Sequence, residues 1–419
     1  MIDHFLGTLT GPCSVKDGDS VLVCCSGGID SMVLLELMRR AAPVLNLRLG
    51  VVHVEHGLRG KASASDAGFV LDTCRRLSLK SYLYELRMNP DSPNLEEEAR
   101  KRRYEAIHGC MKKFGFRVAA TGHTMHDQAE TILYRIIRGS GIRGLAGMDY
   151  TTEGGIIRPL LDMKREDIHS FAVKNRIPYV EDSSNTDTNR ARNLIRHEIL
   201  PRMKKINPGT VESIFRLSGI ARQEGLIVDA LVKHLQEQAC TLDWGIIRAY
   251  RRDCLVKAHD AVLRRFIIDV AASMLDEPRG IDSLQVDSLL SVLRGERRAH
   301  TLRRKLRVSV DEDMVIFRHA GRGPYYQIHI PSPGTYSLDP VRQAVRIRSL
   351  PDTSERTVLR SALPGDRIQG KKVFEVLRSA GVSSSLRHVW PVLLSGDTIL
   401  AVAGMNDRVA DSPFEVVLT

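Results

Sequence analysis

The chain has 419 residues, 43% of them hydrophobic, and its 61 Lys and Arg outnumber its 50 Asp and Glu to give a formal net charge of +11. This composition excludes a disordered or fibrous protein and predicts two or three globular domains, while the basic balance fits either a polyanionic partner or charge that serves solubility alone. The seven cysteines show no Cys-x-x-Cys spacing, so we expect reduced thiols. The sequence has no signal peptide and no apolar run that could span a bilayer. We therefore expect a soluble, cytoplasmic protein with no membrane partner.

The first two hundred residues alternate β-rich runs with helical periodicity. Strands are predicted at Val21–Cys25, Leu47–His53, Ser81–Leu86 and Phe116–Ala120, and helices at Ser31–Arg40, Ser65–Leu77, Leu95–Met111 and His126–Arg138. Strands that alternate with helices predict a parallel sheet that is covered on both faces, which is a Rossmann-like α/β fold.

The rhythm changes after Leu200, and Ile206–Gly209 is a break signal. From about Val211 to Arg294 the pattern is helical only, and Leu302–Phe317 is basic and strand-like. The tail mixes short strands with one helix near Val373–Ala380. We therefore expect a catalytic α/β domain over residues 1–205, a helical middle domain over residues 206–325 and a small mixed α/β domain over residues 340–419.

The first predicted strand runs directly into the loop Ser26-Gly27-Gly28-Ile29-Asp30-Ser31 and then into a helix. Glycines let the backbone approach an anion, the helix N-terminus offers free N–H groups, and the two serines can add hydroxyl donors. The loop lacks the Gly-Lys-Ser/Thr ending of a Walker loop. Asp30 would repel phosphates unless a metal bridges them, so we predict that it binds Mg²⁺ on a pyrophosphate. The alternative is an ordinary strand-to-helix turn with an N-cap serine.

Polar residues gather at the start of the helix His126–Arg138, where Asp127 and Glu130 share a face and His123 precedes the first turn. Because this helix follows a predicted strand, these groups lie at the carboxyl edge of the sheet, where open α/β folds bind ligands. Asp127 is predicted to be a second magnesium ligand. Two alternatives stay open, namely zinc at His123, His126 and Asp127, and helix capping by Asp127 and His126.

Basic residues supply candidates for phosphate and RNA contact. Arg100, Arg103 and Tyr104 fall on one face of a predicted helix, where fixed guanidinium groups suit an ATP phosphate, and the alternative is a solvated charged face. The glycine-rich loop with Arg138 and Arg143 could contact RNA or shield the site.

A polar cluster follows near residue 190. It contains Asp182, Asp187, Arg192 and Arg196, and its carboxylates suit an amine substrate. The alternative is a turn network that caps the predicted helix Arg192–Leu200. Farther on, Arg297–Arg307 carries six Lys and Arg and no acid, which fits phosphate contact or a solvated face.

The loop Ser26–Ser31 resembles that of the pyrophosphate-loop ATPases, which cleave ATP between its α- and β-phosphates. Other segments resemble the tRNA(Ile)-lysidine synthetase family: HVEHGLRG (His53–Gly60), GHTMHDQAET (Gly122–Thr131), RGSGIRGLAGM (Arg138–Met148), RPLL (Arg158–Leu161), EDSSNTD and RNLIRHEILP (within Glu181–Pro201), PGDRI (Pro364–Ile368) and RHVWPVLL (Arg387–Leu394). The resemblance covers nearly the whole chain and is weakest in the helical middle. Glu55 and Met125 sit in these segments among neighbours that match better.

The resemblance implies ATP and Mg²⁺ as cofactors, with free L-lysine and a tRNA(Ile) bearing a CAU anticodon as substrates. ATP would activate the C2 oxygen of the wobble cytidine, and the lysine ε-amine would then displace AMP. The family also points to Arg100 and Arg103 as groups that counter charge on phosphorus, to residues 181–201 for the lysine pocket, and to a homodimer.

Two rival functions remain. One is another pyrophosphate-loop enzyme, such as a tRNA thiolase or an amidating ligase, although neither paired cysteines nor a glutaminase-like domain is evident. The other is a non-catalytic RNA-binding protein, against which the acids Asp30, Asp127 and Glu130 argue.

Overall fold

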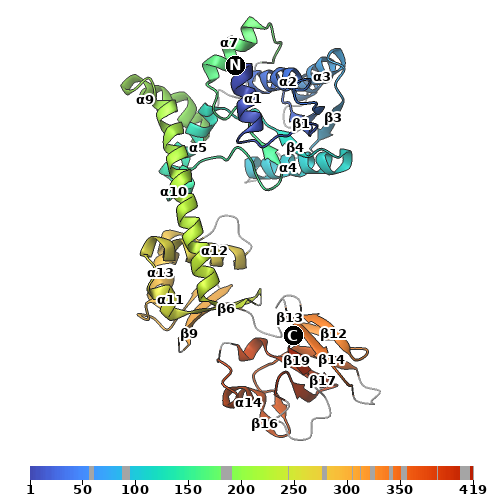
Figure 1. The fold of residues 1–419 in the computed structure, drawn as a ribbon, viewed down its shortest axis with the longest axis vertical. Coiled ribbons are helices and arrows are strands. Elements are labelled where there is room, and N and C mark those ends of the chain that lie inside the picture. The colour runs from blue at the N-terminus through green and yellow to red at the C-terminus, as the bar shows by residue number, and fades with distance from the viewer. Residues whose placement is uncertain are drawn as a thin grey trace. The chain divides into compact units, whose positions relative to one another are not determined.

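The computed structural model describes residues 1–55, 61–86, 95–180, 191–243, 245–275, 281–303, 305–311, 313–320, 326–338, 343–350, 356–384, 386–405 and 416–418. The chain forms two compact units, Met1–Gly225 and Leu226–Thr419 (Figure 1). The division into three domains stays a prediction. Over the described ranges, no helix has the length and apolar character needed to cross a membrane.

A five-stranded parallel sheet forms the centre of the first unit. Its strands are β1 (Ser20–Cys24), β2 (Arg48–Glu55), β3 (Ser81–Glu85), β4 (Val118–Ala120) and β5 (Ile156–Ile157), in the order β3-β2-β1-β4-β5. The four predicted strands and their parallel arrangement are confirmed. The fifth strand was not predicted, because two residues are too few to show a pattern.

Helices cover both faces of this sheet. They are α1 (Ile2–Thr10), α2 (Ile29–Ala41), α3 (Lys61–Arg76) and α7 (Arg165–Lys174) on one side and α4 (Leu95–Phe114) on the other. Helix α5 (Met125–Ile137) follows β4 and packs in a separate core with Ile195 and Leu200. Side chains of β1 alternate between two cores, with Val21 and Val23 in the core that contains α2 and α7, and Leu22 in the core that contains Ile107 of α4. A strand that is buried on both faces has a continuous run of apolar residues, as β1 does. Such runs are typical of parallel sheets that helices cover on both faces, which is the predicted fold class.

The strand order creates a switch point between β1 and β4. The chain leaves β1 for β2 and β3 on one side and then returns to β4 on the other side, with Val23 paired to Ala120. The segments that follow Cys24 and Ala120 therefore open at the same carboxyl edge and diverge. Ligands of open α/β sheets bind at such a point.

Short helices complete the first unit. They are α6 (Ile142–Leu145), α8 (Ala191–Leu194), the π-helix η2 (Ile195–Ile199) and α9 (Leu200–Ile206), and then α10 (Thr210–Ala239) continues into the second unit. The predicted break at Ile206–Gly209 is confirmed. The helix passes through Pro201 because proline is tolerated in a first helical turn.

The second unit begins differently from the prediction of helices only up to Arg294. The strands β6 (Cys240–Asp243) and β7 (Ile247–Arg251) join β8 (Ala299–Leu302), β9 (Leu306–Asp311) and β10 (Met314–His319) in an antiparallel sheet. The helices α11 (Arg252–Val256), α12 (Asp260–Leu275) and α13 (Ser283–Leu293) accompany it. The prediction missed β6 and β7 because each is short and β7 mixes arginines with residues buried on both of its faces, Ile247 and Ala249 on one and Tyr250 on the other.

The described residues of the tail form three further sheets. They are β11 (Gln327–His329), β14 (Thr357–Ser361), β17 (Pro391–Ser395) and β18 (Thr398–Val402); β12 (Gly334–Leu338), β13 (Gln343–Ile347) and β19 (Val416–Leu418); and β15 (Arg367–Ile368) with β16 (Lys371–Lys372). The predicted helix is confirmed as α14 (Val373–Ser379), and a 3-10 turn η3 (Arg387–Val389) follows. Ile247 and Ile316 share a core with Leu359 and Leu393, so the tail packs against the preceding sheet.

Helix α7 offers a test of how the first unit is held together. Ile168 is fully buried against the core of α2, whereas Val173 on the same helix is 61% exposed. We expect Ile168→Ala to lower the free energy of unfolding by about 2–5 kcal/mol and Val173→Ala to change it by less than about 0.5 kcal/mol. Urea denaturation measures both values. Equal losses in the two variants would contradict the packing described here.

Candidate active site

The loop Ser26–Ser31 is held together by one hydroxyl. Ser31 Oγ donates to the carbonyl of Gly28 at 2.8 Å and accepts from the Ser26 N–H at 3.2 Å. The residue at the N-cap of α2 is Gly28, not a serine, so the alternative of a serine-capped turn is wrong. Gly27 has φ of +93°, a conformation that favours glycine, and a Cβ atom there would lie 3.4 Å from the Val70 side chain.

The loops that follow β1 and β4 pack against each other through their backbones. A Cβ atom on Gly122 would lie 3.2 Å from the Asp30 carbonyl and from the Ser31 nitrogen. Only a residue without a side chain allows this approach without a shift of one loop. The contact brings Asp30 toward the start of α5, where Asp127 lies.

The carboxylate of Asp30 is the least compensated group at this edge. Its Oδ1 is buried and has no hydrogen-bond partner among the described residues. Burial and, next, the charge of Asp127 raise its pKa from 3.8 to about 6, while Arg165 and Arg196 act in the opposite direction. The group is therefore ionised at neutral pH but costly to keep so.

Asp127 has two roles in the geometry. Its Oδ2 accepts hydrogen bonds from the N–H and the hydroxyl of Thr124, each at 2.8 Å, which completes a capping box at the start of α5. The capping alternative is thus confirmed for this residue. Its Oδ1 faces two guanidinium groups, at 3.1 Å from Arg196 and 3.9 Å from Arg165.

Arg196 lies between two acids of α5. It binds Glu130 through two parallel hydrogen bonds, Nε to Oε1 at 2.7 Å and Nη2 to Oε2 at 2.9 Å, and it also contacts Asp127. Glu130 is 3% exposed, and burial is the main cause of its raised pKa. Arg196 belongs to the π-helix η2, a rare element that often marks functional sites. The charges of this cluster partly balance one another.

The donors present fit magnesium on a nucleotide. Mg²⁺ commonly binds one or two protein carboxylates together with phosphate oxygens and water. Asp30 offers an unpaired oxygen, and Asp127 is near enough to raise the pKa of Asp30. Within the described ranges, no group of three or more His, Cys, Asp or Glu side chains could hold a metal, which excludes the zinc alternative at His123, His126 and Asp127.

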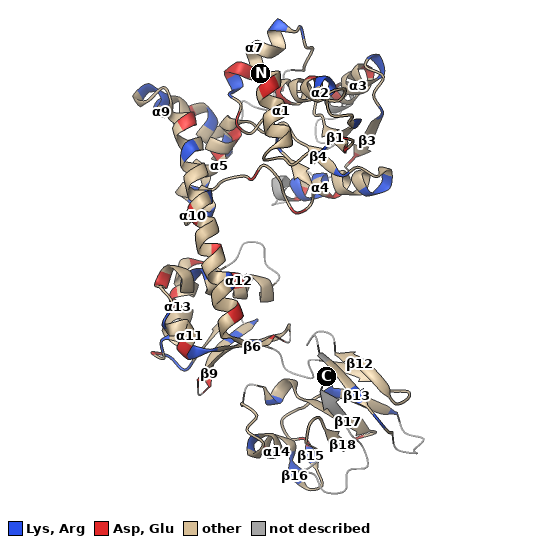
Figure 2. Ribbon diagram, viewed as in Figure 1, with Lys and Arg blue, Asp and Glu red and all other residues tan. Residues whose placement is uncertain are grey.

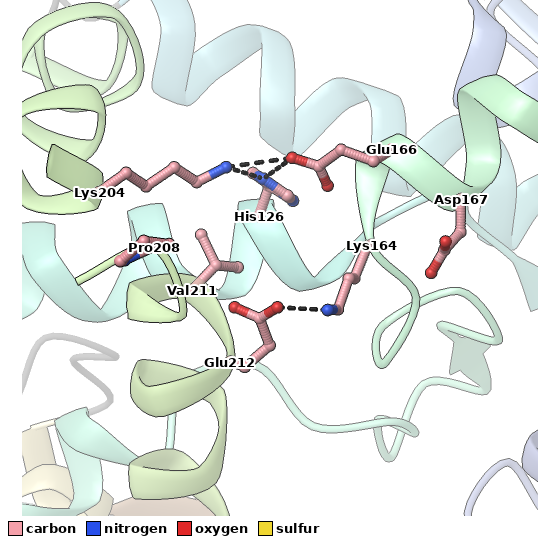
Figure 3. Close-up of a pocket in the computed structure, with 8 residues that line it drawn as sticks. All are labelled: His126, Lys164, Glu166, Asp167, Lys204, Pro208, Val211 and Glu212. Carbon is pink, nitrogen blue, oxygen red and sulfur yellow. Dashed lines mark hydrogen bonds and ion pairs between the residues drawn. The ribbon is translucent and has the colours of Figure 1, made fainter.

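The two histidines have different surroundings. His123 Nδ1 lies 2.9 Å from the hydroxyl of Thr121, and burial lowers its pKa to about 4, so this imidazole is neutral at neutral pH. His126 instead lines a hollow of about 280 Å³ (Figure 3), where its Nε2 lies 3.1 Å from Lys204 Nζ.

The hollow beside His126 is lined by ion pairs between helices. Lys204 of α9 binds Glu166 of α7 at 3.1 Å, and Lys164 binds Glu212 of α10. Because these charges neutralise one another in pairs, we interpret the hollow as a junction of helices and not as a ligand site.

Two predicted arginines, Arg100 and Arg103, belong to α4. Arg100 lies over the ring of Tyr104 with its Cζ 5.3 Å from the centroid, and the charges of Arg100 and Arg103 both lower the pKa of His123. These two arginines therefore lie on the side of the candidate site, on a helix rich in Lys and Arg (Figure 2).

The other predicted site residues lie on the surface or outside the residues that the structure describes. Arg138, Arg143 and Arg192 are exposed, and Arg138 stacks on Tyr134. Asp182 and Asp187 lie outside the described residues. Of the two residues that depart from the family pattern, Met125 is a buried core residue, and Glu55 is the last residue of β2.

Sequence reasoning missed two residues of the site. Thr124 caps α5, and the Thr-x-x-Asp spacing that precedes an apolar run was an available signal. Arg165 begins α7 and faces Asp127, and only the tertiary packing of α7 brings it there.

The raised pKa of Asp30 predicts an effect on stability. An acid whose pKa is higher in the folded state stabilises the fold at low pH, and this contribution is lost as the pH rises from 3.8 through about 6. We expect Asp30→Asn to be more stable than wild type by about 1–3 kcal/mol at about pH 7.5, and the difference to shrink toward about pH 5. Urea denaturation at the two pH values measures this. A less stable variant at the higher pH would show that the carboxylate is compensated.

Comparisons with known proteins place this site in a family. The PP-loop domain family matches residues 3–203. Curated tRNA(Ile)-lysidine synthases are similar: that of Solibacter usitatus is 35% identical over 66% of this chain and 61% of its own length, and that of Thermosipho africanus is 36% identical over 52% and 51%. These two matches thus span less than two thirds of each relative. That of Symbiobacterium thermophilum is 32% identical over 94% of this chain and 91% of its own length. The chain belongs to the tRNA(Ile)-lysidine synthase family.

Proposed function

We propose that the protein ligates free L-lysine to C2 of the wobble cytidine in a CAU-anticodon tRNA(Ile), with ATP converted to AMP and pyrophosphate. The observation that carries the proposal is the Asp30 carboxylate, whose Oδ1 is buried without a hydrogen-bond partner among the described residues, beside Asp127 at the switch point of a PP-loop domain. The names of the relatives supply the tRNA and the product.

The nucleotide would lie over the loop Ser26–Ser31. The N–H groups at the start of α2 suit phosphate oxygens, and Gly27 supplies the positive φ that turns the chain from β1 into this loop. Asp30 and Asp127 would hold Mg²⁺, which when bound stabilises charge on the leaving pyrophosphate. A cation at this position would offset the repulsion between the two carboxylates.

The reaction has two balanced steps. The C2 oxygen of the cytidine attacks the α-phosphorus of ATP, and the bond to pyrophosphate breaks. The lysine ε-nitrogen then attacks C2, the bond from C2 to oxygen breaks, and AMP leaves with that oxygen while the nitrogen loses a proton. We assign charge stabilisation at phosphorus to Arg100 and Arg103, and we propose that the neutral imidazole of His123 relays the amine proton to water without keeping it.

Lysine and the tRNA would be bound by residues of the segments 138–143 and 182–196. We propose that Asp182 or Asp187 binds the lysine amine, and that Arg138, Arg143, Arg192 and Arg196 line the path of the RNA. Arg196 would act through Asp127 and Glu130, to which it is bound. An RNA base is reached by splaying it from its loop. We also propose a homodimer in the cytoplasm, on the family resemblance alone.

The proposal is tested by mixing the protein with ATP, Mg²⁺, labelled lysine and a set of tRNA transcripts. We expect label only in a CAU-anticodon tRNA, and no label or AMP with Asp30→Asn although that variant still binds tRNA. Asp72→Asn, which changes an exposed acid on α3, is the matched control and should stay active. Sulfur or ammonia transfer without lysine incorporation would identify a rival enzyme of the superfamily, and tRNA binding without AMP formation would indicate an RNA-binding protein.

The arginines of α4 allow a comparison within one helix. Arg102 lies between the two candidates and pairs with Glu98 at 2.6 Å. We expect Arg100→Ala and Arg103→Ala to lower kcat by roughly 10²-fold or more, because each removes a positive charge from the reacting phosphate. Arg102→Ala should keep nearly full activity. Single-turnover AMP formation measures all three, and equal losses would show that α4 contributes only general positive charge.

A further inference from the structure

The second half of the segment Arg138–Met148 is bound by side chains from two helices. Gln128 of α5 donates through Nε2 to the carbonyls of Ala146 and Met148, each at 3.2 Å, and its Oε1 accepts from the Met148 N–H at 2.7 Å. Arg222 of α10 donates through Nη2 to the same two carbonyls, each at 2.8 Å. Both helices therefore hold the same short stretch of backbone.

Further contacts complete this clamp, which we define as Gln128, Arg135 and Arg222. Arg135 Nη1 donates to the carbonyls of Gly144 and Gly147 at 3.0 and 2.8 Å, and Arg222 Nε binds the Asp149 carboxylate at 2.9 Å. Gln128 is fully buried. Buried polar groups with this many partners specify one arrangement of the chain, because breaking it leaves polar atoms unpaired.

The clamp depends on a glycine. Gly147 has φ of +68°, and a Cβ atom there would lie 2.4 Å from Gln128 Nε2. No other residue type lets the glutamine reach the backbone without a shift. The sequence of this stretch is thus matched to the clamp and not only to the requirements of a turn.

Residues 137–143, which precede the clamped stretch, are presented to solvent. Ile137 and Ile142 are 64% and 38% exposed, and Arg138 and Arg143 are exposed beside them. Apolar side chains and guanidinium groups together suit RNA, because they contact base faces and phosphates respectively. A loop that is already ordered loses less entropy when it binds.

We propose that Arg222 is a positioning residue: through the clamp it holds Gly144–Asp149 so that residues 137–143 form a preordered surface for tRNA. This inference rests on the proposed function. It gives α10 a role in substrate binding through the loop, in addition to its role as the connection between the two units.

The test compares Arg222→Ala with Arg216→Ala, measuring affinity for a CAU-anticodon tRNA by fluorescence anisotropy and affinity for ATP by calorimetry. Arg216 lies on the same helix, is exposed and contacts only Ser213 in its own helix among the contacts described, so both variants lose one positive charge. We expect Arg222→Ala to weaken tRNA binding roughly tenfold, the effect of losing hydrogen bonds from one charged donor, with ATP affinity within about twofold. Arg222→Lys should recover part of the loss, and it keeps the test valid if the alanine variant does not fold. Hydrogen exchange across residues 138–149 should be faster in Arg222→Ala only.

Two results would overturn the proposal. One is equal tRNA affinity in Arg222→Ala and Arg216→Ala, which would reduce the role of Arg222 to its charge. The other is parallel loss of tRNA and ATP affinity, which would indicate a general structural defect. Absence of lysine incorporation by the wild-type protein would contradict the proposed function. It would not affect the binding comparison, which does not use that reaction.

Discussion

The arrangement of the first unit centres on one unfavourable interaction, the approach of two carboxylates at the edge of the sheet. Asp30 is half-buried, its Oδ1 is buried without a hydrogen-bond partner among the described residues, and burial together with the charge of Asp127 raises its pKa to about 6. Such a group persists only where the surrounding structure stabilises it. Arg165 and Arg196 supply part of that stabilisation, and a bound cation with a polyphosphate would supply the rest.

The fold explains how the two acids are brought together. β1 and β4 are neighbours, so the residues that follow them meet at a switch point, and Gly122 lets the two backbones touch. The capping box at Thr124 and the paired bonds from Arg196 to Glu130 then fix the first turns of α5. From the same turns, Gln128 reaches the loop that precedes β5, so catalytic and RNA-binding candidates share one rigid helix.

The sequence predicted those parts of this arrangement that depend on local pattern. Apolar periodicity identified four strands of the parallel sheet, and glycine and acid spacing identified the loop around Asp30. It did not predict β5, which is too short, or β6 and β7, which are short and show no clear alternation of polar and apolar residues. Nor could it pair Arg196 with Glu130 across a separation of 66 residues, because a polar contact between distant segments leaves no periodic trace. Arg222 and Gln128 bind the same backbone carbonyls of a third segment, and the sequence could not predict this for the same reason.

The central claim is that the protein compensates the Asp30 carboxylate only in part, so that this group can hold a cation on the nucleotide. Calorimetric titration of ATP, with and without Mg²⁺, into the wild-type protein and Asp30→Asn tests it most directly. The account predicts that Mg²⁺ strengthens ATP binding markedly in the wild-type protein and little in the variant, and that the variant binds metal-free ATP better than the wild type, since one repulsive charge is gone. The same dependence on Mg²⁺ in both proteins would contradict the claim.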